Sequence, residues 1–211
     1  MLQPPLPYLW PELVEEAALV HGFSPLQVGR ALDELFGGLP VDGTVTALIG
    51  SIWSLAPVPC GALVDKIREF LAGQGQETGT RGEETEPEAG GLLPLRPEIG
   101  PERLPSELAA ETRTLYGMIR ARALASQMAP ASIQTGEVEL GAGDACRFSA
   151  VLRRVLAPGF LARDQGLCEK ELLEPSPLKH LRAGEPVALG QIVPEPTRGS
   201  QPEQYSVSAL I

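Results

Sequence analysis

The stretch between Asp42 and Asp65 contains no charged side chain and is the most apolar run of the sequence. Two structures fit such a run: a bilayer span, which needs about 20 apolar residues, or a buried helix followed by a turn. Two prolines in its second half disfavour a continuous helix, and no excess of Lys or Arg flanks it to orient a span. We therefore expect a buried helix from about Thr44 to Leu55, then a turn, and the question of whether residues 43–64 contact lipid stays open.

Charge restricts the partners that such a chain can have. The 211 residues carry a formal net charge of −10, with a sequence pI near 4.8. Binding to nucleic acid or anionic lipid depends on Lys and Arg that neutralise phosphates. We therefore expect neither nucleic acid nor a membrane as a partner. The length fits one domain or two small ones.

Cysteine usage and the N-terminal sequence predict the compartment. The three cysteines, Cys60, Cys146 and Cys168, are widely spaced and form no C-x-x-C pair. This pattern is typical of buried thiols in a reducing compartment. The first residues lack the basic region of a signal peptide, so we expect a cytoplasmic protein without a metal or other cofactor.

Helical patterns dominate residues 8–73. A helix is predicted over 11–20, and Ser24 with Gln27 forms a capping box that begins a second helix, in which apolar residues recur every three or four positions up to Phe36. A further helix is predicted over 60–72. With the helix of the uncharged run, these elements predict a small N-terminal helical bundle.

Residues 74–105 are predicted to be a flexible acidic linker rich in Pro, Gly and Glu. The first half has no large apolar residue, so burial cannot offset the entropy lost on ordering. Its second half contains several leucines and can dock in extended form, on either lobe or on a partner. The interaction surface that we expect comprises Trp53, Leu92, Leu93 and Leu95.

Residues 106–211 are predicted to form an α+β lobe. Ser106 is the expected N-cap of a long helix that ends before Pro130. Strands are predicted over 133–140, 187–193 and 205–211. Residues 146–156 fit a helix or a strand. The whole chain is thus expected to be α+β: helical bundle, linker, then a long helix with a short-stranded β lobe.

One glycine-rich segment can bind an anion. The segment Leu140-Gly-Ala-Gly-Asp-Ala resembles the Gly-Ala-Gly-Asp motif of ribokinase-like sugar kinases. The resemblance implies that Asp144 is a general base and that the glycines open a helix that cradles a phosphate. It covers about six residues, and we favour a turn after a strand. The expected ligand-binding residues are Gly141, Gly143, Asp144 and Arg147, with no catalytic residue assigned.

A second short segment is similar to another family. Ala183-Gly-Glu-Pro-Val-Ala-Leu is similar to a strand opening in ligand-sensing domains of the chorismate-lyase-like fold, found in bacterial transcription regulators. The similarity implies a sheet that lines a small-molecule pocket. A turn between two strands, with proline at the entry, is the alternative.

Histidines and arginines complete the candidate chemistry. His180 can pair with Cys146 or Cys168 as base and nucleophile, although structural buried cysteines are commoner. His21 fits the C-terminal end of the first helix, where positive charge is favourable. Arginines gather in two groups and can form an anion-binding face, but we favour a solvated helix side that compensates nearby Glu. They are Arg113, Arg120 and Arg122, and Arg147, Arg153, Arg154 and Arg163.

The sequence therefore predicts a non-enzymatic, adaptor-like interaction or assembly protein that acts as a subunit of a larger complex. A protein partner is expected, and a homo-oligomer is an open alternative. The second hypothesis is a ligand-sensing α+β domain for an anionic small molecule, with the N-terminal bundle as its regulator.

Overall fold

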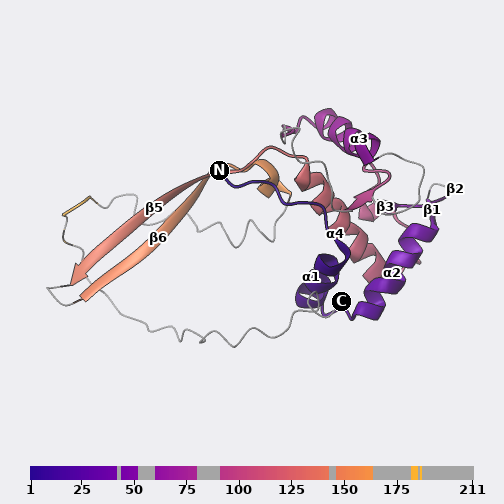
Figure 1. The fold of residues 1–211 in the computed structure, drawn as a ribbon, viewed down its shortest axis with the longest axis horizontal. Helices are drawn as coiled ribbons and strands as arrows, with labels where there is room; N and C mark the ends of the chain where they lie inside the picture. The colour runs from indigo at the N-terminus through magenta and orange to yellow at the C-terminus, as the bar shows by residue number, and fades with distance from the viewer. Residues whose placement is uncertain are drawn as a thin grey trace.

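The computed structural model describes residues 1–41, 44–51, 60–79, 91–142, 146–163, 182–184 and 186. Figure 1 shows a helical body from which a long two-stranded hairpin projects. Four helices appear in the described residues: α1 (Trp10–His21), α2 (Pro25–Gly37), α3 (Cys60–Gly73) and α4 (Ala110–Ser126). The helices predicted over 11–20 and 60–72 are therefore confirmed within one or two residues at each end.

The start of α2 shows why its prediction was accurate. The Ser24 side chain accepts a hydrogen bond from the backbone N–H of Gln27 at 3.3 Å, and the Gln27 side chain accepts one from the backbone N–H of Ser24 at 2.9 Å. This reciprocal pair satisfies two N–H groups that a helix start leaves without partners. Most of the predicted apolar face is buried, with Val28 and Leu35 fully covered, whereas Phe36 at its end is exposed.

The predicted helix in the uncharged run is wrong. The described residues there form β2 (Thr44–Thr46) and β3 (Ile49–Ser51), and β1 (Leu39–Val41) directly precedes the run. β1 and β2 pair antiparallel as a small hairpin. Threonine and β-branched residues at positions 44–49 fit a pleated, half-buried surface better than a helix. Residues 52–59, which include Trp53, lie outside the described residues.

The second half of the predicted linker is part of the interior. β4 (Leu92–Pro94) pairs antiparallel with β3, with Gly50 opposite Leu93. The chain then turns through a short 3-10 helix, η1 (Pro101–Arg103), before α4. The extended docking that the sequence allowed therefore occurs on this chain itself. Residues 80–90 of the predicted linker lie outside the described residues.

Two clusters of buried side chains form the core, and β4 and α4 contribute to both. Leu92 belongs to the first cluster, with α1 and α2, whereas Leu93 belongs to the second, with α3. Adjacent strand residues point to opposite faces, so a strand between two clusters serves both. Along α4, Leu115 lies in the first cluster and Leu124 in the second.

The long hairpin consists of β5 (Ser132–Ala142) and β6 (Cys146–Ala157), paired antiparallel along their length. A short 3-10 helix, η2 (Gly159–Ala162), follows it and packs its buried Phe160 and Leu161 into the second cluster. The strand predicted over 133–140 is confirmed, and the ambiguous segment 146–156 is a strand. The strands predicted over 187–193 and 205–211 lie outside the described residues.

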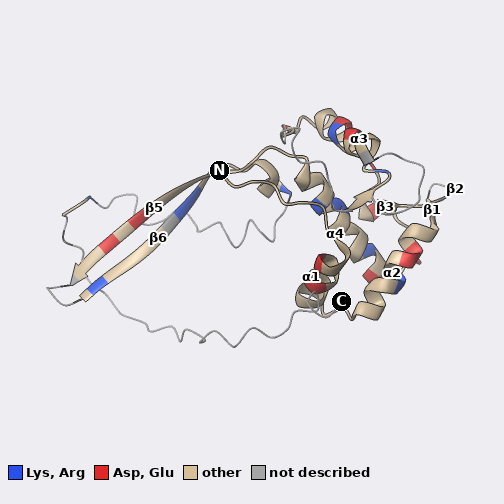
Figure 2. Ribbon diagram, viewed as in Figure 1, with Lys and Arg blue, Asp and Glu red and all other residues tan. Residues whose placement is uncertain are grey.

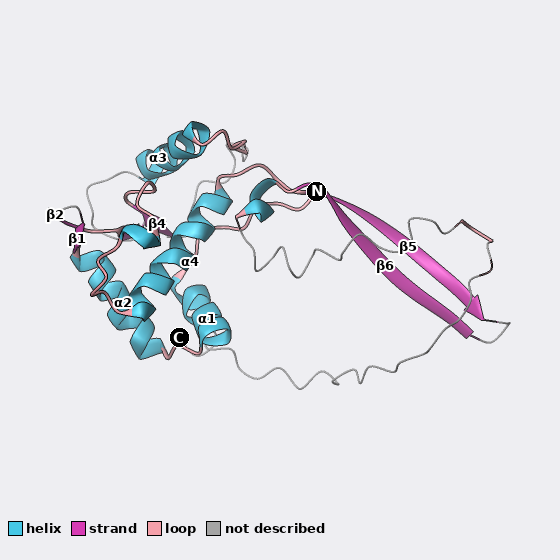
Figure 3. Cartoon of the chain, turned by 180° about the vertical axis from the view of Figure 1, so that it is seen from behind, coloured by secondary structure: helices cyan, strands magenta, loops and turns pink. Residues whose placement is uncertain are grey.

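The N-terminus lies at the root of this hairpin (Figures 1 and 3). Leu2 and Ala131 exchange two backbone hydrogen bonds of 2.8 and 3.0 Å. The body on the other side of this point contains all four described helices, as Figure 3 shows from behind.

The prediction of a mixed α+β fold is confirmed by the four helices and the small antiparallel sheets. Helix α4 begins at Ala110, four residues after the predicted cap at Ser106. Among the described helices, none is both long enough and apolar enough to cross a membrane.

Candidate nucleic-acid interface

Helix α4 and the segment before it provide the frame of the candidate site. The buried face of α4 carries Leu115, Tyr116, Ile119 and Ala123, which recur at helical spacing. Thr112, on the same face, donates its hydroxyl hydrogen to Glu34 of α2 at 2.7 Å. This face fixes α4 against the body, so the arginines of the helix project from a supported position.

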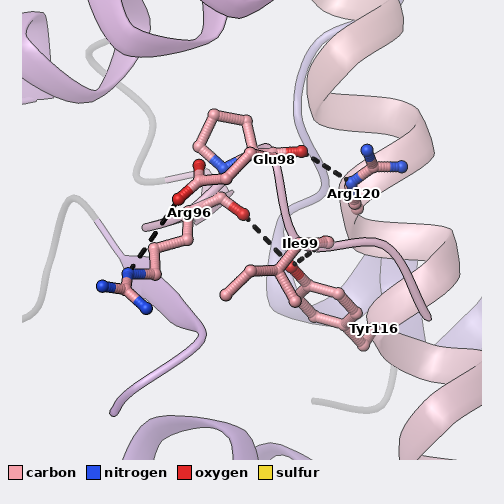
Figure 4. A network of polar contacts seen from close by, with 6 residues as sticks. Arg96, Glu98, Ile99, Tyr116 and Arg120 are labelled. Carbon is pink, nitrogen blue, oxygen red and sulfur yellow. Dashed lines mark hydrogen bonds and ion pairs between the residues drawn. The ribbon is translucent and has the colours of Figure 1, made fainter. Parts of the chain in front are cut away.

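Figure 4 shows the polar contacts that hold residues 96–99 against α4. The buried Tyr116 hydroxyl donates to the backbone oxygen of Ile99 at 2.8 Å, and Arg96 lies 4.0 Å from Glu98. Burial, partly opposed by the charge of Arg120, raises the pKa of Tyr116 to about 12. The phenol is therefore a neutral structural donor at ordinary pH, not a nucleophile.

The arginines of α4 donate to main-chain oxygens. Arg113 donates to the oxygen of Pro105 at 2.6 Å, and the Nε of Arg120 donates to that of Pro97 at 2.9 Å. Such bonds position each guanidinium group but do not neutralise its charge. In the described part of the chain, neither arginine forms an ion pair with a carboxylate.

Three arginines tie α3, α4 and η2 together, and we call Arg68, Arg120 and Arg163 the arginine corner. Arg68 donates through Nε to the side-chain oxygen of Gln127 at 3.2 Å. Arg163, directly after η2, donates to the side-chain oxygen of Gln74. All of these acceptors are neutral, so the corner keeps a positive charge.

Two members of the arginine corner, Arg120 and Arg163, are close enough for one to influence the other. Burial, and secondly the positive charge of Arg120, lowers the pKa of Arg163. The Arg120 guanidinium also lies over the Phe70 ring of α3, 5.6 Å from its centroid. Like charges that form no ion pair with a carboxylate of the described residues favour an anionic partner, and the planar guanidinium matches phosphate geometry.

The expected ligand-binding residues lie elsewhere, toward the far end of the hairpin. Gly141 on β5 is the register partner of Arg147 on β6. Gly143 and Asp144 fall in residues 143–145, outside the described residues. A strand follows these residues where the sugar-kinase resemblance implied a helix, so the described structure lacks the helix N-terminus of the implied phosphate cradle.

Two residues of the expected interaction surface are buried. Leu92 is 5% exposed and Leu93 is 1% exposed, both within the core of this chain. Leu95 is half-buried and packs against the second cluster. Trp53 lies outside the described residues.

The pairing of His180 with a cysteine stays a prediction, because the described residues include only Cys146 of these candidates. His21 stacks on Phe23 with 5.4 Å between ring centroids. Cys146 is exposed, while its suggested partner His180 and also Cys168 lie outside the described residues. No group of three His, Cys, Asp or Glu side chains able to hold a metal ion occurs in the described residues.

Sequence reasoning included Arg120 and Arg163 among the arginine groups but did not single out Arg68. Figure 2 shows blue segments along α4 and near both ends of β6, with red segments on β5. The described residues carry nearly equal numbers of basic and acidic side chains, and most of the acidic excess lies in segments such as 80–90 and 164–181. A count of charged residues in each segment, in place of one net charge for the whole chain, could have indicated that the folded body is not strongly acidic and can hold a group of arginines.

The comparisons indicate a class of protein: the chain is similar to DNA topoisomerase I. No protein-family model matches the sequence. The DNA topoisomerase 1 of Xylella fastidiosa strain 9a5c is 26% identical over 227 aligned positions, which cover 99% of this chain and 27% of that protein. The enzyme of strain Temecula1 matches to the same extent.

A solved structure supports the same fold. The full-length topoisomerase I of Thermotoga maritima superposes with a TM-score of 0.61 at 24% sequence identity, covering 78% of this chain and 27% of that one. At 24% sequence identity, this structural similarity supports a shared fold and nothing about function. The chain spans about a quarter of the length of the curated relatives that it matches.

The similarity to DNA topoisomerases overturns three predictions. The assembly-protein function and its ligand-sensing alternative are wrong, because the relatives are enzymes named for their action on DNA. The prediction that the chain is a protein-interaction subunit of a complex is wrong for the same reason. The exclusion of nucleic acid as a partner is also wrong, and its physical error was to treat the net charge as evenly spread over the chain.

Proposed function

We propose that this chain is a DNA-binding part of a topoisomerase-like enzyme. The observation that carries the proposal is the alignment of 99% of the chain with DNA topoisomerase 1 sequences. The cytoplasmic location expected from the sequence agrees with a protein that acts on DNA. The proposal concerns binding, because the chain corresponds to 27% of the relative's length.

The arginine corner is the proposed contact with the DNA backbone. A guanidinium has five N–H donors, and Arg68 and Arg120 each use Nε in the hydrogen bonds described above. Their remaining donors can bind phosphate oxygens. Contacts of this kind position a nucleic acid without reading its sequence.

Anisotropy of fluorescent oligonucleotides, single-stranded and duplex, tests the proposal on the full chain. We expect Arg68→Gln combined with Arg163→Gln to weaken binding about tenfold and to reduce the slope of log K against log salt by about one for each lost phosphate contact. Arg30→Gln, on α2, is the control for either single substitution, Arg68→Gln or Arg163→Gln, because each of the three removes one positive charge.

Two results would contradict the proposal. One is the absence of salt-dependent DNA binding by the unaltered chain. The other is an equal loss of affinity in Arg30→Gln, which would show that net charge alone, and not the corner, determines binding.

A further inference from the structure

Gln127, directly after α4, lies where the segment that follows α3 meets the end of α4. The backbone N–H of Gly79 donates to the Gln127 backbone oxygen at 3.2 Å, and that of Ala129 donates to the Glu77 oxygen at 3.0 Å. The two backbones approach so closely that a Cβ at Gly79 would lie 2.7 Å from the Met128 oxygen. This pairing fixes the segment after α3 against the segment after α4.

The Gln127 side chain connects this junction to Arg68 of α3 through a chain of hydrogen bonds. The Ser126 hydroxyl donates to the Ala123 backbone oxygen at 2.7 Å, and the Gln127 amide nitrogen donates to the Ser126 hydroxyl oxygen at 3.1 Å. The Gln127 amide oxygen accepts from Arg68 Nε at 3.2 Å. Ser126 is 2% exposed, so the chain of hydrogen bonds starts in the protein interior.

The hydrogen bonds of this chain are consistent in only one direction. A hydroxyl has a single donor, and that of Ser126 is used at Ala123, so Ser126 accepts from the Gln127 side chain. Arginine only donates, so the other end of the same amide must present its oxygen to Arg68. Both ends require the same orientation of the amide, and the Arg68 guanidinium is therefore held from the protein interior.

The bond to Gln127 orients the Arg68 guanidinium without neutralising its charge. Nε–H is one of the five donors, and the other four N–H groups are on the two terminal nitrogens, which this bond does not use. A carboxylate at position 127 would accept the same bond but would form an ion pair with the arginine. A neutral amide is thus the acceptor that suits an arginine whose charge neutralises a phosphate.

We propose that Gln127 is a positioning residue for the nucleic-acid backbone, which holds Arg68 through Nε so that the two terminal nitrogens of the guanidinium meet a phosphate. A long side chain that is ordered before binding loses less conformational freedom on binding, and this raises affinity. The inference rests on the proposed contact of the arginine corner with DNA. It gives Gln127 a role in that contact without requiring Gln127 to touch the nucleic acid.

Anisotropy of the same fluorescent oligonucleotides with the full chain tests the proposal by double substitution. We expect Gln127→Met to weaken binding about threefold, because Arg68 must then be ordered during binding. In the Arg68→Gln background the same change should leave affinity unaltered, whereas in the Arg30→Gln background it should again weaken binding about threefold. Arg30, on α2, is the matched control because each background lacks one positive charge.

Gln127→Glu gives a second readout that a purely structural role would not change. The carboxylate keeps the size of the side chain but pairs with the Arg68 charge. We therefore expect the slope of log K against log salt to fall by about one in the unaltered background and to stay the same in Arg68→Gln. Thermal unfolding monitored by circular dichroism establishes that each variant is folded, and Gln127→Glu keeps the test decisive if Gln127→Met does not fold.

Three results would overturn this inference and leave the proposed function standing. The first is an affinity that Gln127→Met does not change. The second is an equal loss of affinity in the Arg68→Gln background, which would show that Gln127 acts independently of Arg68. The third is a salt slope that Gln127→Glu leaves unaltered. Absence of salt-dependent DNA binding by the unaltered chain would instead overturn the proposed function and this inference together.

Discussion

Three side chains of α4 donate hydrogen bonds to main-chain oxygens. Tyr116 donates to Ile99, Arg120 to Pro97 and Arg113 to Pro105. A segment without regular secondary structure needs partners for its backbone groups when it is buried. These three side chains provide them, so the path of residues 96–105 depends on a few long-range donors.

Tyr116 makes stability depend on alkaline pH. Its pKa in the folded chain is about 12, against an ordinary value of 10.0. Between these values the unfolded chain loses the phenol proton while the folded chain keeps it, so the free energy of unfolding falls as pH rises through this window. Below pH 10 the contribution is complete.

We expect Tyr116→Phe to lose about 1–2 kcal/mol at neutral pH, because the Ile99 oxygen is left without its donor. Between pH 9 and pH 11 the unaltered chain should lose more stability than this variant, by up to about 1 kcal/mol. Urea unfolding at both pH values measures the difference. Equal pH dependence of the two proteins would refute the assignment.

At the scale of elements, local signals were predictable and distant pairings were not. The capping box at Ser24 and the face that includes Val28 and Leu35 are complete within one helix, so the sequence alone predicted them. β3 pairs with β4 about forty residues later. The sequence of residues 44–51 contains no signal that they pair with β4. Without knowledge of that pairing, an uncharged apolar run has the pattern of a buried helix.

The same distinction applies to the candidate site. Arg120 could be placed on a helix from periodicity, but its proximity to Phe70 and Arg163 results from the packing of α3 and η2 on α4. Spatial adjacency of this kind requires the tertiary structure. The exposed position of Arg147 on a strand could not be predicted either, because the sequence of residues 146–156 fitted both a helix and a strand.

The two predicted serine caps provide a matched comparison. Ser24→Ala should destabilise the protein by about 1 kcal/mol, because it removes the acceptor for the Gln27 N–H. Ser106→Ala should change stability by less than about 0.5 kcal/mol, because Ser106 is exposed and α4 begins only at Ala110. Thermal or urea unfolding monitored by circular dichroism measures both. A larger loss for Ser106→Ala would contradict the helix start.

At the scale of the whole molecule, the segment predicted to be a tether contributes to both core clusters. Leu92 and Ile99 belong to the first cluster and Leu93 to the second. The division into residues 8–73, 74–105 and 106–211 stays a prediction. The first of these ranges nevertheless shares a buried core with α4.

Leu93→Ala tests the role of this segment. We expect a loss of about 2–4 kcal/mol, because a side chain 1% exposed leaves a cavity in the second cluster. Leu19→Ala is the matched control, since Leu19 is 79% exposed and its truncation should cost less than about 0.5 kcal/mol. A small effect of Leu93→Ala in urea unfolding would mean that this segment does not support the core.

The root of the hairpin has a mechanical consequence. Met128 and Ala131, between α4 and β5, are buried in the second cluster, and Leu2 is hydrogen-bonded to Ala131. The hairpin is thus anchored at its base by packing and by main-chain hydrogen bonds. A displacement at the base of the hairpin is therefore passed to α4 through packed side chains, since Leu124 and Ala125 of α4 lie in the same cluster as Met128 and Ala131.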